Sequence, residues 1–400
     1  MATEAPAIQQ ILAQEERQRS LRAGYLALTL FSVGHFFIDL YSSALGAFQP
    51  LLGEKLGLSL TDAGILGGIS VFSASVVQPA YGYLSDRFHT RMFSVLAPAV
   101  AGIFISSYGL ASNFAWLALL VFLGGAGVAS FHPQASARAT SGIRSHRGRW
   151  MAVFISSGSL GLAAGPAYFS TILTRFGLSL AAWAAIPGVL ITLLMLWLLP
   201  AKAIQPSHQR SGRFDWRPLQ AVWKPLTILY FLVFIRSIIQ IVFGQFLPLY
   251  LHRERNFDVA SASYALSLYL ASGAIGGFLG GHLADRFGGR RIILFSMAGC
   301  LPFLALFFFT TGVASMIGLA LAALILLFTV PVNVVMAQDL VPTQVGTVSA
   351  LMMGFAWGMA GLIFIPLTGW IGDHSSLQQA LAMLTVFPVL GIFLTLKLPK

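Results

Sequence analysis

The sequence predicts an all-α membrane protein whose twelve transmembrane helices form two pseudo-symmetric six-helix lobes. Of its 400 residues, 57% are hydrophobic and 9% are charged, against about 25% charged residues in a typical soluble domain. The apolar residues form runs long enough to cross a bilayer. In addition, the segment Gly82 to Arg91 returns at Gly281 to Arg290 with its Gly, Leu, Asp, Arg and Phe kept. Such an internal repeat is typical of a chain built from two copies of one unit.

The chain is predicted to divide into four parts. Residues 1–23 are polar, carry charges of both signs from Glu4 onward and have no apolar core. We therefore expect a cytoplasmic tail there rather than a signal peptide. The N-terminal lobe is expected at 24–200 and the C-terminal lobe at 225–400. Between them, the polar segment 201–224 is expected to be a cytoplasmic linker.

Each predicted span has about 20 residues, the length that crosses a hydrocarbon core of about 30 Å. The expected limits are 24–47, 61–83, 92–112, 115–138, 149–172, 180–199, 225–250, 259–282, 292–311, 313–337, 345–370 and 377–396.

Basic residues alternate between the loops in a way that sets the orientation. The loops on the side of the chain termini contain Arg87, Arg91, Arg144, Arg147, Arg149, Lys202, Arg210, Arg213, Arg217, Lys224, Arg286, Arg290 and Arg291. The opposite loops contain Lys55, Arg175, Arg253 and Arg255. The positive-inside rule then places both termini in the cytoplasm. Because the net charge of +11 lies in these short loops, it does not indicate nucleic-acid binding.

The sequence gives no sign of an enzyme. It has a single cysteine, no Walker A motif, and no spacing typical of metal ligands or of a nucleophile with its base. We therefore expect no catalytic residues, no metal site and no cofactor.

Ionisable residues within the spans are the first candidates for a binding site, because each costs several kcal/mol unless it is paired or faces water. His35 and Asp39 lie four residues apart in span one, hence on one helical face. His35 lies about 16 Å along the helix from Gly24, near the bilayer midplane. Arg236 reaches a similar depth in span seven. In one interpretation, Asp39 tuned by His35 carries a coupling proton and Arg236 attracts an anionic substrate group. In the other, Asp39 and Arg236 form a buried salt bridge with His35 as hydrogen-bond partner.

Further polar residues are candidates for substrate binding. In span four, His132, Gln134 and Arg138 surround Pro133, which loosens the helix. His132 is equally compatible with a helix-to-helix hydrogen bond, and Arg138 with a cytoplasmic-end anchor or a partner of Asp86. The remaining two candidates, on spans seven and ten, are Gln240 and Asn333.

The repeated segment resembles the signature G-x-L-(A/S)-D-R-x-G-x-(R/K) between helices two and three of the major facilitator superfamily, with His89 where the first copy should have Gly. The resemblance implies that the segment latches the cytoplasmic face when a transporter opens outward. Asp86 would then lie near 343–347 and Asp285 near 147–150. The alternative is that these charges serve topology alone. The gating residues implied are Gly82, Asp86, Arg87, Arg91, Gly281, Asp285, Arg286 and Arg290.

A narrower resemblance is to fosmidomycin resistance exporters. It rests on segments in both halves, among them 34–39, 78–82, 131–133 and 337–340. Gly165-Pro166 in span five also resembles the core of the antiporter motif of drug exporters, which adds both residues to the gating set.

These resemblances imply a proton-coupled antiporter that exports a small polar or anionic compound, such as fosmidomycin or another drug. We expect it to act as a monomer in the bacterial inner membrane, with a small molecule, protons and lipid as its partners. A proton-coupled importer of an organic anion or nutrient would use the same residues. A non-transporting membrane sensor would bind a ligand without flux.

Overall fold

The computed structural model describes residues 4–88, 90–141, 143, 147–199 and 216–398. All regular elements within these ranges are helices, and eleven segments are long and apolar enough to cross a membrane. One of them, Arg149–Leu198, contains two helices, because the chain turns at Gly177, where φ is 76°. The described helices therefore confirm the predicted fold class of an all-α membrane protein with twelve spans.

The N-terminal lobe is built from eight α-helices. They are α1 Glu4–Ser42, α2 Ala44–Leu56, α3 Leu60–Val71, α4 Gln78–Phe88, α5 Met92–Ser106, α6 Phe114–Arg138, α7 Arg147–Leu180 and α8 Ile186–Leu198. Shorter turns are a π-helical turn at Phe72–Val76 and 3-10 turns at Ser107–Leu110 and Ala181–Ala185.

The C-terminal lobe follows the same plan. Its helices are α9 Arg217–Ala221, α10 Trp223–Arg255, α11 Val259–Phe287, α12 Gly289–Phe309, α13 Gly312–Leu326, α14 Thr329–Leu340, α15 Val345–Ser349, α16 Ala356–His374, α17 Leu377–Met383 and α18 Val386–Leu396. A 3-10 turn at Pro342–Gln344 and a π-helical turn at Ala350–Phe355 precede α16.

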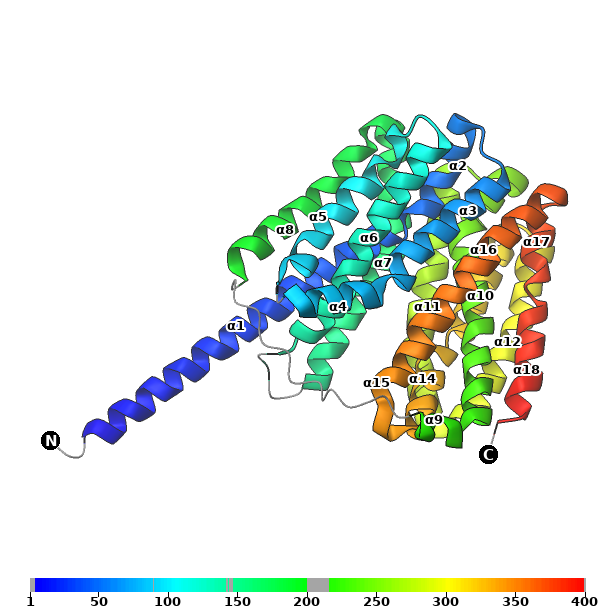
Figure 1. Ribbon diagram of the computed structural model, residues 1–400. Helices are drawn as coiled ribbons and strands as arrows, with labels where there is room; N and C mark the ends of the chain where they lie inside the picture. Colours follow the sequence, from blue (N-terminus) through cyan, green and yellow to red (C-terminus); the bar gives the residue numbers. More distant parts are fainter. Residues whose placement is uncertain (1–3, 89, 142, 144–146, 200–215, 399–400) are drawn as a thin grey trace.

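The first span differs from its predicted limits at both ends. Helix α1 begins at Glu4 and continues without a break into the bundle (Figure 1), so most of the expected tail is helical, while the apolar span itself begins at Leu21. At the other end the span continues through α2 to Leu56 instead of ending at 47. Of the predicted linker, residues 201–215 lie outside the described part of the chain.

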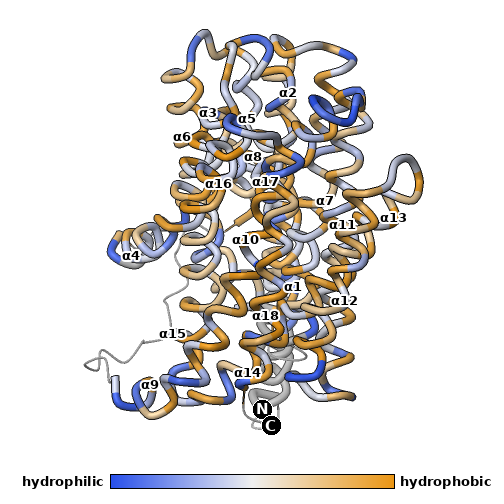
Figure 2. The backbone as a smooth tube through the Cα atoms, turned by 90° about the vertical axis from the view of Figure 1, so that its right-hand side faces the viewer, coloured by the Kyte–Doolittle hydropathy of each residue, from blue (hydrophilic) through white to orange (hydrophobic). Residues whose placement is uncertain are grey.

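Both described chain ends lie on one side of the bundle, at the bottom of Figure 1. We call this the terminus side, and the opposite end the far side. Figure 2 shows much of the hydrophilic sequence at these two ends, with largely hydrophobic helices between them. This is the distribution that a bilayer requires of helices that cross it.

Basic side chains at matching places in the two lobes make the same kind of contact. Arg91 donates hydrogen bonds to the carbonyl oxygens of Leu196 and Leu199 at the end of α8. Arg290 donates to Thr395 and Leu396 at the end of α18. A cation at these free carbonyls stabilises a helix C-terminus. The last arginine of each repeated segment therefore anchors the sixth span of its own lobe.

Helices α1 and α7 approach each other closely because glycines face the contact. A β-carbon on Gly161 would lie 2.8 Å from the carbonyl carbon of Phe36 and 3.0 Å from its Cα. Gly165 lies against Leu40 in the same way, one turn further along α7. Small residues at such spacing are what allow membrane helices to pack backbone against backbone.

The lobes are joined on the far side. Asp373, at the end of α16, accepts hydrogen bonds from the backbone nitrogens of Leu60 and Thr61 at 2.8 Å each, and from Thr61 Oγ1 at 2.5 Å. A C-terminal-lobe carboxylate therefore caps an N-terminal-lobe helix. His252 Nε2 also lies 3.2 Å from Glu54 Oε1 across the lobe boundary. At the opposite end, α4 and α15 lie apart (Figure 1).

Replacing Gly161 by Ala should destabilise the protein by about 1–3 kcal/mol, because the added methyl group pushes α1 away from α7. The measurement is thermal unfolding of purified protein in detergent. The matched control is Gly354→Ala, since a β-carbon there would have no atom within 4 Å. Equal melting temperatures for the two variants would contradict the close packing.

Replacing Asp373 by Ala should open the far side. Loss of a helix cap costs about 1 kcal/mol, so the ratio of open to closed molecules should rise about fivefold. Double electron–electron resonance between spin labels on α2 and α17 measures this distance, and the single native cysteine, Cys300, is fully buried. Asp62→Ala removes a cap of the same helix within one lobe and should leave the distance unchanged. If Asp373→Ala leaves it unchanged too, the cap does not hold the lobes together.

Candidate functional site

A cavity of about 270 Å³ lies between the two lobes. Helices α1, α4 and α6 contribute Asp39, Gln78 and His132 to its wall, and α10 and its neighbour α16 contribute Gln240 and Trp357. Polar side chains from opposite lobes therefore line one space within the bundle. Such a concave site between lobes is where a transporter of this architecture binds its substrate.

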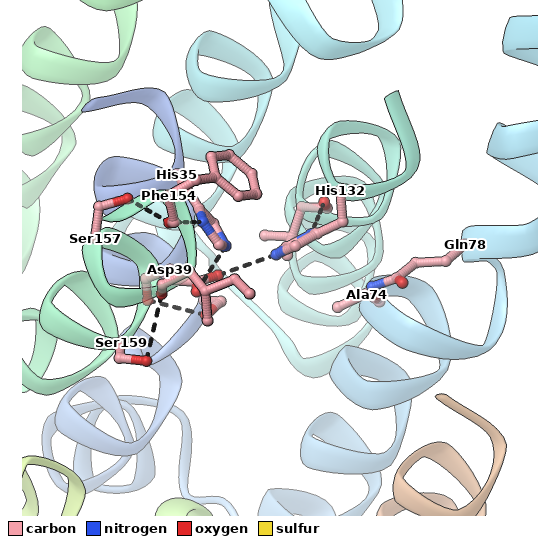
Figure 3. Close-up of polar contacts among 11 residues, drawn as sticks. His35, Asp39, Ala74, Gln78, His132, Phe154, Ser157 and Ser159 are labelled. Atoms are coloured by element: carbon pink, nitrogen blue, oxygen red, sulfur yellow. Dashed lines mark hydrogen bonds and ion pairs between the residues drawn. The ribbon is translucent and has the colours of Figure 1, made fainter. Parts of the chain in front are cut away.

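One carboxylate on the wall of this cavity is shared by two imidazoles. His35 Nε2 lies 3.3 Å from Asp39 Oδ2, and His132 Nε2 lies 3.3 Å from Asp39 Oδ1. Figure 3 shows the two imidazoles approaching Asp39 from α1 and from α6. We call His35, Asp39 and His132 the His–Asp–His cluster. His35 is 7% exposed, whereas Asp39 and His132 face the cavity.

The second nitrogen of each imidazole determines how the cluster holds protons. His35 Nδ1 lies 2.8 Å from the carbonyl oxygen of Phe154, and His132 Nδ1 lies 3.0 Å from that of Val128. A carbonyl oxygen only accepts hydrogen bonds, so each Nδ1 must carry a hydrogen. In a neutral ring, Nε2 then presents a lone pair to the carboxylate. Both contacts with Asp39 are hydrogen bonds only when the cluster holds two further protons, on both rings or on one ring and the carboxylate, so the bonding of the cluster depends on its proton load.

The backbone of α7 packs directly against the cluster. A β-carbon on Gly158 of α7 would lie 2.5 Å from Asp39 Oδ2 and from His35 Nε2. Among the described residues, the cluster is the one group of His, Cys, Asp and Glu side chains close enough to hold a metal ion, with ligand atoms within 4.8 Å of one another. Each imidazole faces its own carboxylate oxygen, however, so the two Nε2 atoms point at Asp39 rather than at a shared vacant point.

Arg236 is buried behind the cavity wall, with 5% of its surface exposed. It donates hydrogen bonds to Gln240 Oε1 and, at 2.9 Å, to Ser237 Oγ, and its guanidinium lies 5.7 Å from the ring centre of Trp357. Its Nε has no hydrogen-bond partner. No carboxylate in the described part of the chain pairs with it. The alternative of an Asp39–Arg236 salt bridge is therefore wrong for this conformation, because Asp39 is bonded to histidines instead.

Three other predicted substrate-binding residues do not line this cavity. Gln134 uses all four of its hydrogen-bonding positions within the lobe, donating to Ser85 Oγ and Thr90 O and accepting from the nitrogen and hydroxyl of Ser94. Asn333 is fully buried, and neither atom of its amide has a partner. Arg138 is half-buried at the end of α6. Gln240 and His132 remain as the predicted residues on the wall, with Arg236 behind them.

The predicted gating residues of the two repeated segments lie on the terminus side. A β-carbon on Gly82 would lie 3.6 Å from Pro133, and one on Gly281 would lie 3.5 Å from Pro331, so the repeated glycines face prolines in matching places. The charged residues Arg87, Asp285 and Arg286 are exposed. The side chains of Asp86 and Arg147 lie outside the described part of the chain, and the latch stays a prediction. Gly165 and Pro166 lie in α7, where Gly165 contacts α1.

Sequence reasoning missed several residues of the cavity wall. Gln78 lines the same cavity as His132 and donates a hydrogen bond to the carbonyl oxygen of Ala74 at 2.9 Å (Figure 3). Ser70 and Ser75 line the cavity beside it. The sequence contains a pattern that could have indicated these residues. Ser70, Ser75 and Gln78 interrupt a largely apolar span just before Pro79. The π-helical turn at Phe72–Val76 shifts the helical register there, and such turns are frequent at functional sites.

Comparison with known proteins decides the family. The sequence pattern described as Major Facilitator Superfamily matches residues 31–365 and 229–400, which together cover most of the chain. The chain belongs to the major facilitator superfamily. It is therefore a membrane transporter and not an enzyme, as the sequence predicts.

Relatives and solved structures of this superfamily align along nearly the whole chain. The uncharacterised MFS-type transporter YfnC of Bacillus subtilis is 29% identical, covering 98% of this chain and 96% of its own. The fosmidomycin resistance protein of Escherichia coli is 26% identical, covering 94% of each chain. The crystal structure of a mutant of the nucleoside transporter NupG has a TM-score of 0.78 at 14% identity, covering 94% of this chain and 100% of that one. The last comparison shows the fold alone.

Replacing Arg236 by Met should stabilise the protein by about 1–3 kcal/mol, because it removes a buried charge that has no counter-ion. Thermal unfolding in detergent measures the change. The matched control is Arg255→Met, because Arg255 donates hydrogen bonds to the carbonyl oxygens of Thr310 and Phe308. That variant should be less stable than the wild type. A melting temperature for Arg236→Met that falls as far would show that Arg236 is satisfied in the native state.

Proposed function

We propose that the protein is a proton-coupled antiporter that exports a small, polar, anionic compound from the bacterial cytoplasm. The observation that carries the proposal is the His–Asp–His cluster beside a cavity whose opposite wall conceals an unpaired arginine. The cluster provides a site for protons, and Arg236 provides a site for an anion. The similarity to a fosmidomycin resistance protein along the whole chain supports export.

Arg236 becomes available when the substrate displaces Gln240. In the described conformation, Gln240 bonds to the guanidinium and stands between it and the cavity. An anionic oxygen that replaces the amide oxygen gains a charge-assisted hydrogen bond, which is about twice as strong as a neutral one. A phosphonate or carboxylate suits this exchange because it can also accept the free Nε–H. The substrate class therefore follows from the missing counter-ion.

Competition at Asp39 couples the two sites. When the cluster has lost a proton, one carboxylate oxygen is left facing an imidazole lone pair. A hydrogen-bond donor on the substrate, such as a hydroxyl group, can then bond to that oxygen. Reprotonation of the imidazole restores the bond to the histidine and expels the donor. Substrate and proton thus exclude each other at Asp39, which is the condition for antiport.

The orientation follows from charge. The terminus side carries most of the basic loop residues, so we place it in the cytoplasm. The lobes are joined on the far side by Asp373 and by the Glu54–His252 contact. We therefore assign the described conformation to the inward-facing state, in which the substrate enters from the cytoplasm.

Proton-coupled import of an organic anion is a second candidate, and one observation favours it. A cluster with both imidazoles protonated has a net charge of +1, which attracts an anion bound at Arg236. Binding of the proton and of the anion would then assist each other, as in a symporter. The two candidates predict opposite effects of a proton gradient.

The first test is transport in proteoliposomes under imposed pH gradients. The second is the susceptibility of an exporter-deficient bacterium, with and without this protein, to a panel of drugs that includes fosmidomycin. The wild type should protect the cells from the drug. In proteoliposomes, the substrate should move in the direction opposite to the flow of protons. Asp39→Asn and Arg236→Gln should each lower gradient-driven transport at least tenfold, since each removes one of the two binding sites. Asp62→Asn, an acid outside the cavity, is the matched control.

The outcomes separate the alternatives. Substrate that moves in the direction of the protons indicates the importer. Binding without flux in any gradient indicates a sensor. Normal gradient-driven transport by Asp39→Asn would remove the cluster from proton coupling.

A further inference from the structure

A second cavity, of about 730 Å³, lies within the C-terminal lobe. It is enclosed by the first residues of α10, by the turn between α11 and α12, and by the last residues of α14 and α18. It shares no lining residue with the cavity between the lobes. The role proposed for the cavity between the lobes therefore does not account for it.

The wall of this second cavity is divided between apolar and basic groups. The apolar part consists of the leucine and methionine side chains Leu229, Leu294, Met336, Leu340, Leu396 and Leu398. The basic part is the pair Arg290 and Arg291 at the start of α12, with the exposed carboxylate of Asp339 as the acidic group of the wall. An apolar cavity with a net positive rim fits an amphiphile that has an apolar chain and an anionic headgroup.

Arg291 has no structural task that explains its charge. Its neighbour Arg290 anchors the end of α18, whereas Arg291 is exposed and makes no hydrogen bond or ion pair with any described residue. The first copy of the repeat has Met92 at the position that follows Arg91, so the charge is not required by the repeated fold. Arg291 is thus free to meet an external anion.

The position of the cavity indicates the source of that anion. Pro225 of its wall follows the exposed Trp223, and Trp216 is exposed one short helix earlier. Tryptophan gathers at the boundary between lipid and water. Basic pockets between transmembrane helices at this level bind the headgroups of anionic lipids. The linker of this chain is an unsuitable occupant, because Arg210 and Arg213 would be repelled by the same rim.

We propose that this cavity binds one anionic phospholipid from the leaflet on the terminus side. Arg291 holds the phosphate, the charge of Arg290 lies beside it, and the leucine and methionine side chains enclose the first part of the acyl chain. The second repeated segment ends in the turn between α11 and α12. The lipid links this turn to the start of α10 and to the end of α18. This site is independent of the proposed transport function.

The test is native mass spectrometry of the delipidated full-length protein after titration with dioleoyl phosphatidylglycerol, with dioleoyl phosphatidylcholine as the zwitterionic lipid. The wild type should retain one phosphatidylglycerol more tightly than phosphatidylcholine. Arg291→Gln should weaken retention of phosphatidylglycerol about fivefold, the share of one arginine near a membrane surface. The matched control is Arg286→Gln, which removes the same charge from the same turn outside the cavity wall and should retain the lipid.

A second variant and a second ligand make the test independent of folding. Leu294→Trp fills the apolar part, leaves both arginines in place, and should also lose the bound lipid. Inorganic phosphate and glycerol 3-phosphate should fail to displace phosphatidylglycerol. The proposal would be overturned by equal retention of the two lipids, by wild-type retention of phosphatidylglycerol in Arg291→Gln, or by displacement of the lipid by free phosphate.

Discussion

The bonding of one carboxylate to two imidazoles is the interaction on which the functional interpretation of this transporter depends. Asp39 lies in a span where an unpaired charge costs several kcal/mol, and His35 and His132 supply its partners at 3.3 Å. Because backbone carbonyls occupy both Nδ1 atoms, the imidazoles have no freedom to exchange tautomers without losing a bond. The only adjustable quantity is the number of protons. Close packing of α1 on α7 keeps this arrangement in place.

The two lobes share a plan but differ where function is expected. Matching arginines, Arg91 and Arg290, anchor the sixth span of each lobe, and matching glycines face prolines. The first spans of the two lobes differ in charge, since α1 carries Asp39 and α10 carries Arg236. Duplication therefore explains the scaffold, and divergence of a few buried side chains gives each lobe a different charge at the middle of the membrane.

The sequence predicted the fold well because a bilayer leaves few alternatives. Long apolar runs must be helices, and the repeated segment gave the two lobes. The pair His35 and Asp39 was predicted because residues four apart share a face. That His132 completes the cluster could not be predicted, because its distance from Asp39 depends on how α6 packs against α1. Gln134 lies two residues further along α6, and there the helix turns its amide toward Ser85 and Ser94 instead of the cavity. Gln78 was missed because a π-helical turn changes the register of its span.

The three consecutive residues His132, Pro133 and Gln134 connect the His–Asp–His cluster to the repeated segment. His132 bonds to Asp39, Pro133 contacts Gly82, and Gln134 holds Ser85 and the carbonyl oxygen of Thr90. A rotation of α6 that carries His132 away from Asp39 would also disturb the contacts that Pro133 and Gln134 make with the segment between α4 and α5. Helix α6 alone therefore links a change at Asp39, in the middle of the membrane, to the repeated segment at the surface.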